Sequence, residues 1–225
     1  MALWDYSKLR FVLITDRHAA RHPLPVVVQA ALEAGFTAVQ LREKDLTAAE
    51  LFQLGRELRS LTAQYEALLI VNDRVDVALA VEADAAQLGW QSLDVSAARK
   101  AAGERLAFGL GAHNVIEMRQ AIRQRADFVL FGPVFPTPSK EGLVDPVGLE
   151  TLQAMAIPTP MPVVAVGGID KTNVAQVLAT RAAGVALIRA VVAADDPLQA
   201  ASDFIAAAQA TPNFARLEER QYRRS

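Results

Sequence analysis

The feature that most constrains this chain is an eight-fold alternation between short apolar runs and longer amphipathic segments. The runs are rich in Val, Ile and Leu and lack the polar alternation of a half-exposed strand. They indicate strands buried on both faces, which pair in parallel and need helical crossovers. The predicted strands are Phe11–Ile14, Ala38–Leu41, Leu68–Val71, Ala85–Leu88, Ala107–Leu110, Phe128–Phe131, Val163–Val166 and Val185–Ile188.

The amphipathic segments carry helix-start signals. Thr47 and Glu50 have the spacing of a capping box, Asp94 precedes the fourth segment, and Asp170 or Thr172 opens the seventh. Eight strand–helix units in 225 residues predict a single (β/α)8 barrel. The predicted helices are Pro25–Ala34, Thr47–Ala63, Val75–Val81, Val95–Ala102, Val115–Gln124, Gly148–Ala154, Thr172–Arg181 and Pro197–Gln209.

We expect one domain over residues 1–225, with residues 1–10 as an N-terminal extension and 211–225 as a charged tail. A doubly wound open sheet is the alternative architecture. No Gly-x-Gly-x-x-Gly motif follows the first strand, which weakens a dinucleotide-binding interpretation of that alternative.

Composition excludes several functional classes. A net charge of −2 gives no reason to expect a nucleic-acid partner. The lack of cysteine excludes disulfides, thiolate metal sites and a cysteine nucleophile, and it fits a reducing cytoplasm. The N-terminus does not have the pattern of a signal peptide, and the most apolar window, 182–194, is too short to span a bilayer. We therefore expect a cytoplasmic protein with no membrane partner.

Polar residues follow the predicted strands repeatedly, at the end where (β/α)8 barrels carry their function. After the second strand, alternation predicts that Gln40, Arg42 and Lys44 face the barrel mouth, where two cations would suit a phosphate or carboxylate. The alternative is a solvated charge run, because Glu43 and Asp45 balance the two cations in sign.

The third and fifth strands end at residues that suit acid–base or metal chemistry. Asn72 and Asp73 are suited to hold an amine, an amide or Mg²⁺, although Asp73 also lies where it could cap the next helix. His113 is placed for proton transfer near neutral pH. The alternative for His113 is a cap on the helix that follows it.

The seventh and eighth strands predict a phosphate site. Gly167 and Gly168 allow backbone amides to approach a phosphate, and an amide near Ile188 and Arg189 completes the cup. Arg189 adds positive charge. The alternative for the two glycines is a tight turn that needs their φ freedom.

The loop after the sixth strand, Phe131–Lys140, offers two hydroxyls and a cation. Thr137, Ser139 and Lys140 can donate several hydrogen bonds to an anionic substrate. An ordinary solvated turn is the alternative, and the positions of the other candidates around the mouth favour a wall of a binding site.

These residues, in this order, resemble the superfamily of thiamine phosphate synthase and TenI-type thiazole tautomerase. The resemblance spans nearly the whole chain and is carried by these segments: 40–45, 71–73, 87–88, His113, 132–140, 164–169 and 184–190. It implies a phosphate-binding (β/α)8 barrel of thiamine biosynthesis that binds a thiazole phosphate.

The branch within the superfamily is harder to predict. The synthase uses Mg²⁺ to join an aminopyrimidine diphosphate to a thiazole phosphate with release of pyrophosphate, and its resemblance implies Asp73 as a metal ligand. A second aspartate of the synthase pattern is Ser92 here, its strand-four histidine is Gln87, and its serine before the strand-five histidine is Gly111. These departures resemble the tautomerase.

We therefore favour the tautomerase, which needs no metal cofactor and would use His113 as general acid/base on a thiazole carboxylate phosphate. The synthase with Mg²⁺ is the alternative, and a non-catalytic binder of thiazole or thiamine phosphate is the third. The apolar stretch Val26–Val28, and relatives of this type, suggest a homodimer.

Overall fold

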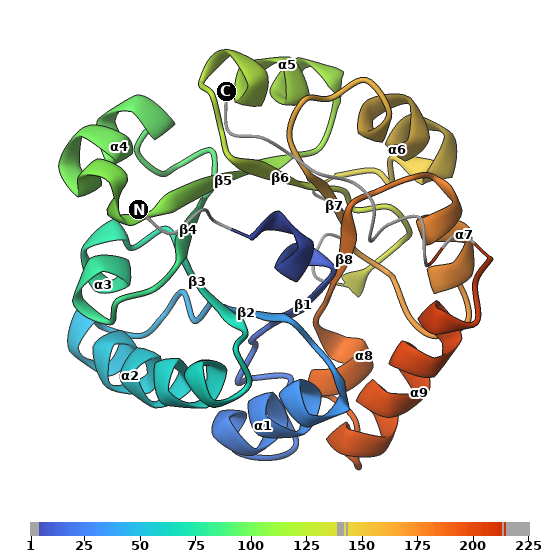
Figure 1. Ribbon diagram of the computed structural model, residues 1–225, viewed down its shortest axis with the longest axis horizontal. Coiled ribbons are helices and arrows are strands. Elements are labelled where there is room, and N and C mark those ends of the chain that lie inside the picture. Colours follow the sequence, from blue (N-terminus) through green and yellow to red (C-terminus); the bar gives the residue numbers. More distant parts are fainter. Residues whose placement is uncertain (1–4, 139–141, 143, 213, 215–225) are drawn as a thin grey trace.

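The structure is a computed structural model that describes residues 5–138, 142, 144–212 and 214. Its strands are all parallel and close into a barrel in chain order, with β1 paired to both β2 and β8 (Figure 1). The (β/α)8 prediction is therefore confirmed and the open sheet is excluded. The strands are β1 (Phe11–Ile14), β2 (Ala38–Leu41), β3 (Leu68–Asn72), β4 (Ala85–Leu88), β5 (Ala107–Ala112), β6 (Phe128–Phe131), β7 (Val163–Val166) and β8 (Gly184–Leu187).

Helices form a ring around this barrel. Thr47 and Glu50 make the expected capping box, and the Asp94 side chain accepts a hydrogen bond from the Ala97 amide, so both cap predictions are confirmed. The helices are α1 (Leu24–Ala34), α2 (Ala48–Gln64), α3 (Val75–Ala80), α4 (Val95–Ala102), α5 (Val115–Arg123), α6 (Gly148–Ala156), α7 (Val174–Ala179), α8 (Arg189–Val192) and α9 (Pro197–Gln209), with 3-10 helices η1 (Tyr6–Leu9) and η2 (Gly103–Arg105).

Several predicted boundaries differ from the structure by one or two residues, and two of these differences have identifiable reasons. Ile188 has φ −121° and ψ −90°, which leaves the β region, so it caps the short helix α8 instead of extending β8. The seventh helix begins at Val174 because the Asp170 carboxylate accepts hydrogen bonds from the Thr172 amide, 2.8 Å away, and hydroxyl, and this contact holds a turn. Periodicity did not predict α8.

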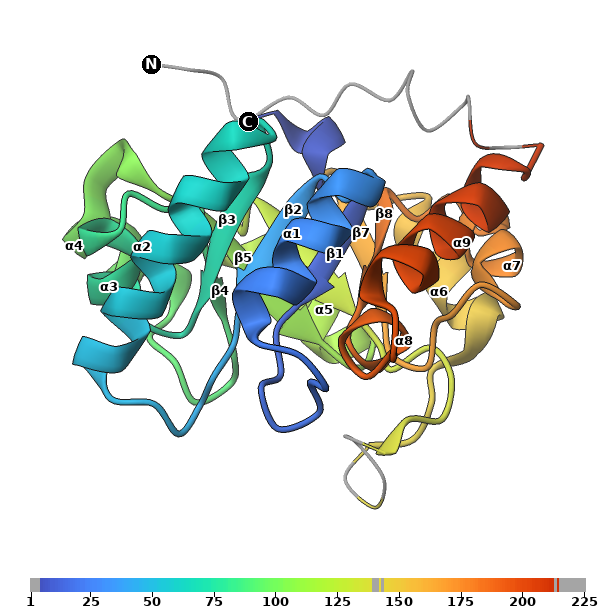
Figure 2. The same ribbon diagram turned by 90° about the horizontal axis from the view of Figure 1, so that it is seen from below.

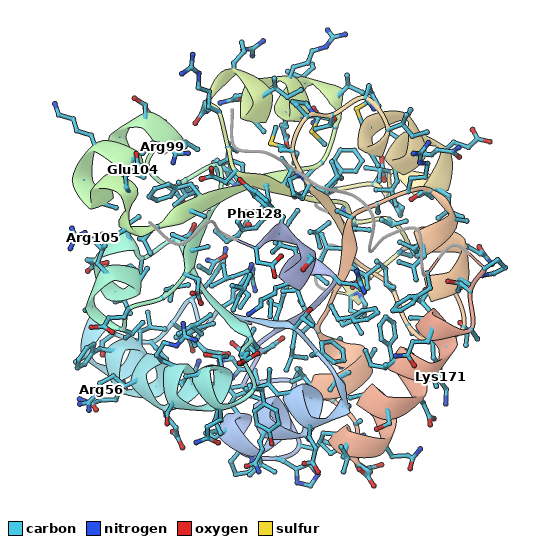
Figure 3. The ribbon with its side chains drawn as sticks, viewed as in Figure 1. Arg56, Arg99, Glu104, Arg105, Phe128 and Lys171 are labelled. Carbon is cyan, nitrogen blue, oxygen red and sulfur yellow. The ribbon has the colours of Figure 1, made fainter. Side chains whose placement is uncertain are left out.

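Strand register sets which side chains share a level inside the barrel. The parallel pairs place one layer at Gln40, Gln87, Leu130 and Ala186, contributed by alternate strands. The next layer toward the carboxyl ends contains Ile14, Asn72, Gly111 and Val166. Below both layers the interior is apolar and includes the fully buried Phe128 (Figure 3).

The amino end of the barrel is closed by η1. Leu9 is fully buried and packs into the interior cluster with Val12, so part of the segment expected to be an extension belongs to the core. Figure 2 shows η1 at one end of the barrel and the β1–α1 and β6–α6 loops at the other. The second of these ends is the carboxyl end of the barrel, or its mouth. The polar side chains Gln40, Gln87 and Asn72 lie on this side of the apolar interior.

The outer apolar shell lies between the strands and the helices. In α1, Val27 and Val28 are fully buried, whereas Val26 is 53% exposed, so the Val26–Val28 stretch does not form an exposed apolar face. The homodimer stays a prediction without that support. No helix in the described part of the chain combines the length and apolar character needed to cross a membrane.

Candidate active site

The β1–α1 and β2–α2 loops are joined by a charged clamp. The Arg17 guanidinium makes two hydrogen bonds to the Asp45 carboxylate, of 2.5 and 2.6 Å, and the His18 ring lies 2.9 Å from the same group. The Arg17 amide donates to Glu43, whose side chain is buried. These contacts from Arg17, then His18, hold the pKa of the Asp45 carboxyl well below its usual range.

The clamp explains the mixed charge run after β2. Glu43 and Asp45 bind Arg17, whereas the Arg42 and Lys44 side chains have no hydrogen-bond or ion-pair partner among the described residues. The alternative of a solvated charge run therefore fits the exposed Lys44 and Asp45 but not Glu43, which is buried. Since β2 ends at Leu41, strand alternation does not extend to Lys44, which is exposed in the following turn. Arg42 is half-buried.

The third and fourth strands bring Asp73 to Ser92. The Ser92 hydroxyl donates to Asp73 Oδ1, and the Gly89 amide donates to the same oxygen over 3.1 Å. Asn72 Nδ2 donates to Asp73 Oδ2 over 2.6 Å. Three donors, the Ser92 hydroxyl, the Gly89 amide and the Asn72 amide, therefore hold one carboxylate at the β3–β4 side of the mouth.

Asp73 does not cap the following helix. Arg74, not Asp73, is the N-cap residue of α3, and its side chain makes no capping hydrogen bond. Asp73 has φ +61°, a left-handed conformation that is uncommon for residues other than glycine and that often marks functional sites. The capping alternative is therefore wrong, and the carboxylate is directed to the β4–α4 turn.

Two buried amides lie one layer below this cluster. Gln40 is 1% exposed and its Nε2 has no partner, and Gln87 is 4% exposed and its Oε1 has no partner among the described residues. A Cβ on Gly109 would lie 2.3 Å from Gln87 Oε1, so only glycine leaves room for this amide. Gln40, a predicted substrate ligand, thus points into the barrel interior.

His113 is anchored by Glu117 on α5. Its Nδ1 lies 2.8 Å from Glu117 Oε2, which also accepts from the His113 amide over 2.8 Å. Burial raises the pKa of the Glu117 carboxyl, but the bonds from His113 outweigh it and leave that pKa below its usual value. Asn114, not His113, caps α5, so the capping alternative is wrong.

The predicted phosphate glycines pack against the β6–α6 loop. Gly167 has φ +98° and Gly168 has φ +66°, and a Cβ on Gly167 would lie 2.6 Å from the Cα of Pro133. The loop bonds to this segment through Val134 N–H to Val166 O, 2.9 Å, and Phe135 N–H to Gly167 O, 3.1 Å. The tight-turn requirement is therefore real, and amide binding to phosphate stays a prediction.

Ile188 and Arg189 lie at the start of α8, beside these glycines in strand order. The Arg189 side chain is exposed and has no hydrogen-bond or ion-pair partner within the described ranges. A short helix after β8 is a usual part of the phosphate site of this fold. Thr137 is half-buried, whereas Ser139 and Lys140 lie outside the described residues.

Oxygen donors for a metal are few at this mouth. Within the described ranges, no group of three His, Cys, Asp or Glu side chains is arranged to share an ion. Asp73 supplies one carboxylate, with the Asn72 amide and the Ser92 hydroxyl beside it. Mg²⁺ is commonly held by one or two carboxylates plus substrate phosphates, so this donor set fits an ion that arrives with a phosphate-bearing substrate.

Three contributors to the site were missed as site residues from the sequence. Arg17 gives no local signal, because its partners are in the next loop. Ser92 was noted only as a departure, although its place after the fourth strand is the signal that could have identified it. Glu117 could have been found, because it follows His113 by four residues at the start of a predicted helix.

Known proteins match the chain over most of its length. The family model described as "Thiamine monophosphate synthase" matches residues 11–191. A "Putative thiamine-phosphate synthase" of Geobacter sulfurreducens is 44% identical over 92% of this chain and 96% of its own, and a "Thiamine-phosphate synthase" of Moorella thermoacetica is 43% identical over 89% and 94%. A solved "Thiamine phosphate pyrophosphorylase" from Pyrococcus furiosus superposes with a TM-score of 0.84 at 38% identity, covering 91% of this chain and 97% of that one.

These matches overturn the choice of the tautomerase branch. These two relatives carry the synthase name at 43% identity or more. The tautomerase prediction depended on His113 and on the departures at Gln87, Ser92 and Gly111. The role of His113 as acid/base in that tautomerisation falls with it. With residues 11–191 matched by its family model, the chain belongs to the thiamine monophosphate synthase family.

Proposed function

We propose that the protein is a thiamine-phosphate synthase, an enzyme that couples an aminopyrimidine diphosphate to a thiazole phosphate. The carbon–oxygen bond between the pyrimidine methylene and the diphosphate breaks, and the electron pair leaves with pyrophosphate. The thiazole nitrogen lone pair forms the new carbon–nitrogen bond. No net oxidation or reduction occurs.

The proposal rests on which charged side chains at the mouth are paired with each other and which are not. Arg17 binds both Glu43 and Asp45, while Arg42, Lys44 and Arg189 have no acidic partner in the described part of the chain. Cations without an internal partner suit a reaction in which both substrates carry phosphate. The synthase names of the relatives support the same conclusion.

The remaining residues have consistent roles under this proposal. Gly167, Gly168 and the amides at Ile188 and Arg189 bind the thiazole phosphate. Arg42 and Lys44 bind the diphosphate, and Thr137 contacts it from the β6–α6 loop. Ser139 and Lys140, which lie outside the described residues, stay ligands predicted from the sequence. Asn72 presents its amide group to the heterocycles, and the buried amide of Gln40 lies one layer below it.

The cluster of Asp73, Asn72 and Ser92 at the mouth fits a magnesium ion. Asp73 would be its protein carboxylate, and the diphosphate oxygens would complete its ligands. When bound, the ion would offset the charge that develops on the departing pyrophosphate. The protein side chains Arg42 and Lys44 would share that work, because positive charge aimed at a leaving group lowers the barrier to its departure.

The test is to incubate the protein with the aminopyrimidine diphosphate and the thiazole phosphate, with and without EDTA. We expect thiamine phosphate and pyrophosphate to form in equal amounts when Mg²⁺ is present without EDTA, and neither to form when EDTA chelates the Mg²⁺. We also expect rescue of a thiamine-requiring strain that lacks its synthase. Binding of both substrates with no product at saturation would contradict the proposal and would identify a non-catalytic binder.

A further inference from the structure

The β4–α4 turn contacts the Asp73 carboxylate through Gly89 and Ser92, and the proposed function does not require these contacts. We propose that Ser92 is a positioning residue that, together with the Gly89 amide, fixes the Asp73 carboxylate in one orientation for binding a divalent cation with pyrophosphate. The inference rests on the proposed function, because it assigns the cation to the site of that reaction.

The hydrogen bonds around Ser92 have one consistent direction. The Gly89 amide donates to Ser92 Oγ over 2.8 Å, so this oxygen acts as an acceptor there. The hydroxyl hydrogen is then directed to Asp73 Oδ1. The turn is closed by the Ser92 amide, which donates to the Gly89 carbonyl over 3.1 Å. Residues 89–92 therefore form a compact unit whose polar groups converge on Asp73.

Counting lone pairs shows what this unit does to the carboxylate. A carboxylate has about four acceptor sites, two on each oxygen. Oδ1 accepts from both Gly89 and Ser92, and Oδ2 accepts from Asn72 over 2.6 Å. Among the described residues this leaves Asp73 one open acceptor site, on Oδ2. The carboxylate is thus prepared to give a cation a single oxygen.

The backbone of Asp73 depends on the same neighbour strand. Its amide donates to the Gln87 carbonyl over 2.9 Å, and its φ is +61°. A left-handed residue other than glycine persists where surrounding contacts over-determine it. Gln87 from β4 holds the backbone of Asp73, and the Gly89–Ser92 turn holds its side chain. Loss of the Ser92 hydroxyl removes one of the two donors to Oδ1 and so loosens the orientation of the carboxylate.

The test compares Ser92→Ala with Ser92→Thr, which keeps the hydroxyl, and with Ser60→Ala, an exposed change on α2. The probe is Mg²⁺ with inorganic pyrophosphate, and the readout is the rise in melting temperature as Mg²⁺ is titrated. We expect Ser92→Ala to need about 10-fold more Mg²⁺ for half the rise, the usual effect of losing a partner of a metal ligand. Ser92→Thr and Ser60→Ala should keep the wild-type midpoint.

The coupling assay on the same proteins separates this inference from the proposed function. Suppose that the wild-type protein couples its substrates. The inference is then overturned, and the function stands, if Ser92→Ala keeps the wild-type Mg²⁺ midpoint or if the melting temperature of the wild type does not rise with Mg²⁺. If wild type does not couple but the Ser92→Ala midpoint shifts, the function fails and the inference stands. Should Ser92→Ala not fold, Ser92→Cys, with its weaker thiol donor, gives the same comparison.

Discussion

The two sides of the mouth are built by different means. On the side of β1 to β4, side chains hold the loops: Arg17 binds Asp45 across two loops, and Ser92 binds Asp73. On the side of β6 and β7, backbone groups bond directly across glycines, as between Phe135 and Gly167. The first side depends on which functional groups are present, and the second depends on the absence of side chains. Substitutions on the first side should therefore impair activity, and substitutions on the second side should impair the stability of the fold.

The largest effect is expected where the backbones touch. Gly167→Ala places a Cβ 2.6 Å from the Cα of Pro133 at φ +98°. Strain and overpacking together should lower the free energy of unfolding by about 3 kcal/mol or more, measured by urea denaturation. Gly148→Ala is the matched control, because it has φ +74° and open space, and it should cost only about 1–2 kcal/mol. Equal losses would contradict the role of close backbone contact.

On the other side, a change of functional group should impair activity more than stability. Asp73→Asn keeps the size of the side chain but removes its charge, and with it the only carboxylate in the Asp73–Ser92 cluster. We expect kcat/KM for coupling to fall by more than about 100-fold, because even the partners of metal ligands cost 10- to 100-fold. Circular dichroism should show an unchanged fold. Full activity at low Mg²⁺ would remove Asp73 from the site.

Smaller effects, on substrate binding, are expected for the cations that have no ion-pair partner among the described residues. Arg42→Gln should raise KM for the diphosphate substrate about 10-fold, the equivalent of one charged hydrogen bond near 1.5 kcal/mol. Arg56→Gln, a change of the same kind on the outside of α2 (Figure 3), should leave KM unchanged. A KM effect that is equal for both would mean that net charge, and not position, attracts the substrate.

The smallest effect should come from the exposed clamp and should depend on pH. The pKa of Asp45 is lowered in the folded state by Arg17, so its contribution to stability is present above the ordinary carboxyl pKa near 4 and is lost as pH falls further. Asp45→Asn should therefore lower the melting temperature slightly at pH 7. The difference from wild type should shrink below pH 4. A difference that grows in acid would contradict the sign of this pKa shift.

Much of the site was visible in the sequence because barrel topology converts order along the chain into position. Once strands such as Ala38–Leu41 and Val163–Val166 were identified, Arg42 and Gly167 had to follow them at one end of the barrel. Contacts between loops were not visible. Arg17 reaches Asp45 across 28 positions, and Ser92 reaches Asp73 across 19, with no periodic pattern linking either pair.

The choice of reaction shows the same limit from another direction. Ser92 was interpreted by its type, as a missing carboxylate, and this favoured the wrong branch. In the structure the hydroxyl bonds to the carboxylate that remains, so the residue supports Asp73. Residue type alone does not say whether a side chain replaces a carboxylate or donates a hydrogen bond to a neighbouring one.

By itself, the sequence determined the barrel and the end at which polar residues collect, because apolar period and strand order are local properties of the chain. Only the tertiary structure decided which of these residues are engaged with one another. It showed that Arg17 binds Glu43 and Asp45, and that Ser92 donates a hydrogen bond to Asp73. It also showed that Pro133 leaves no room for a Cβ at Gly167. These are contacts between segments far apart in the chain, and their distances exist only after the barrel has closed.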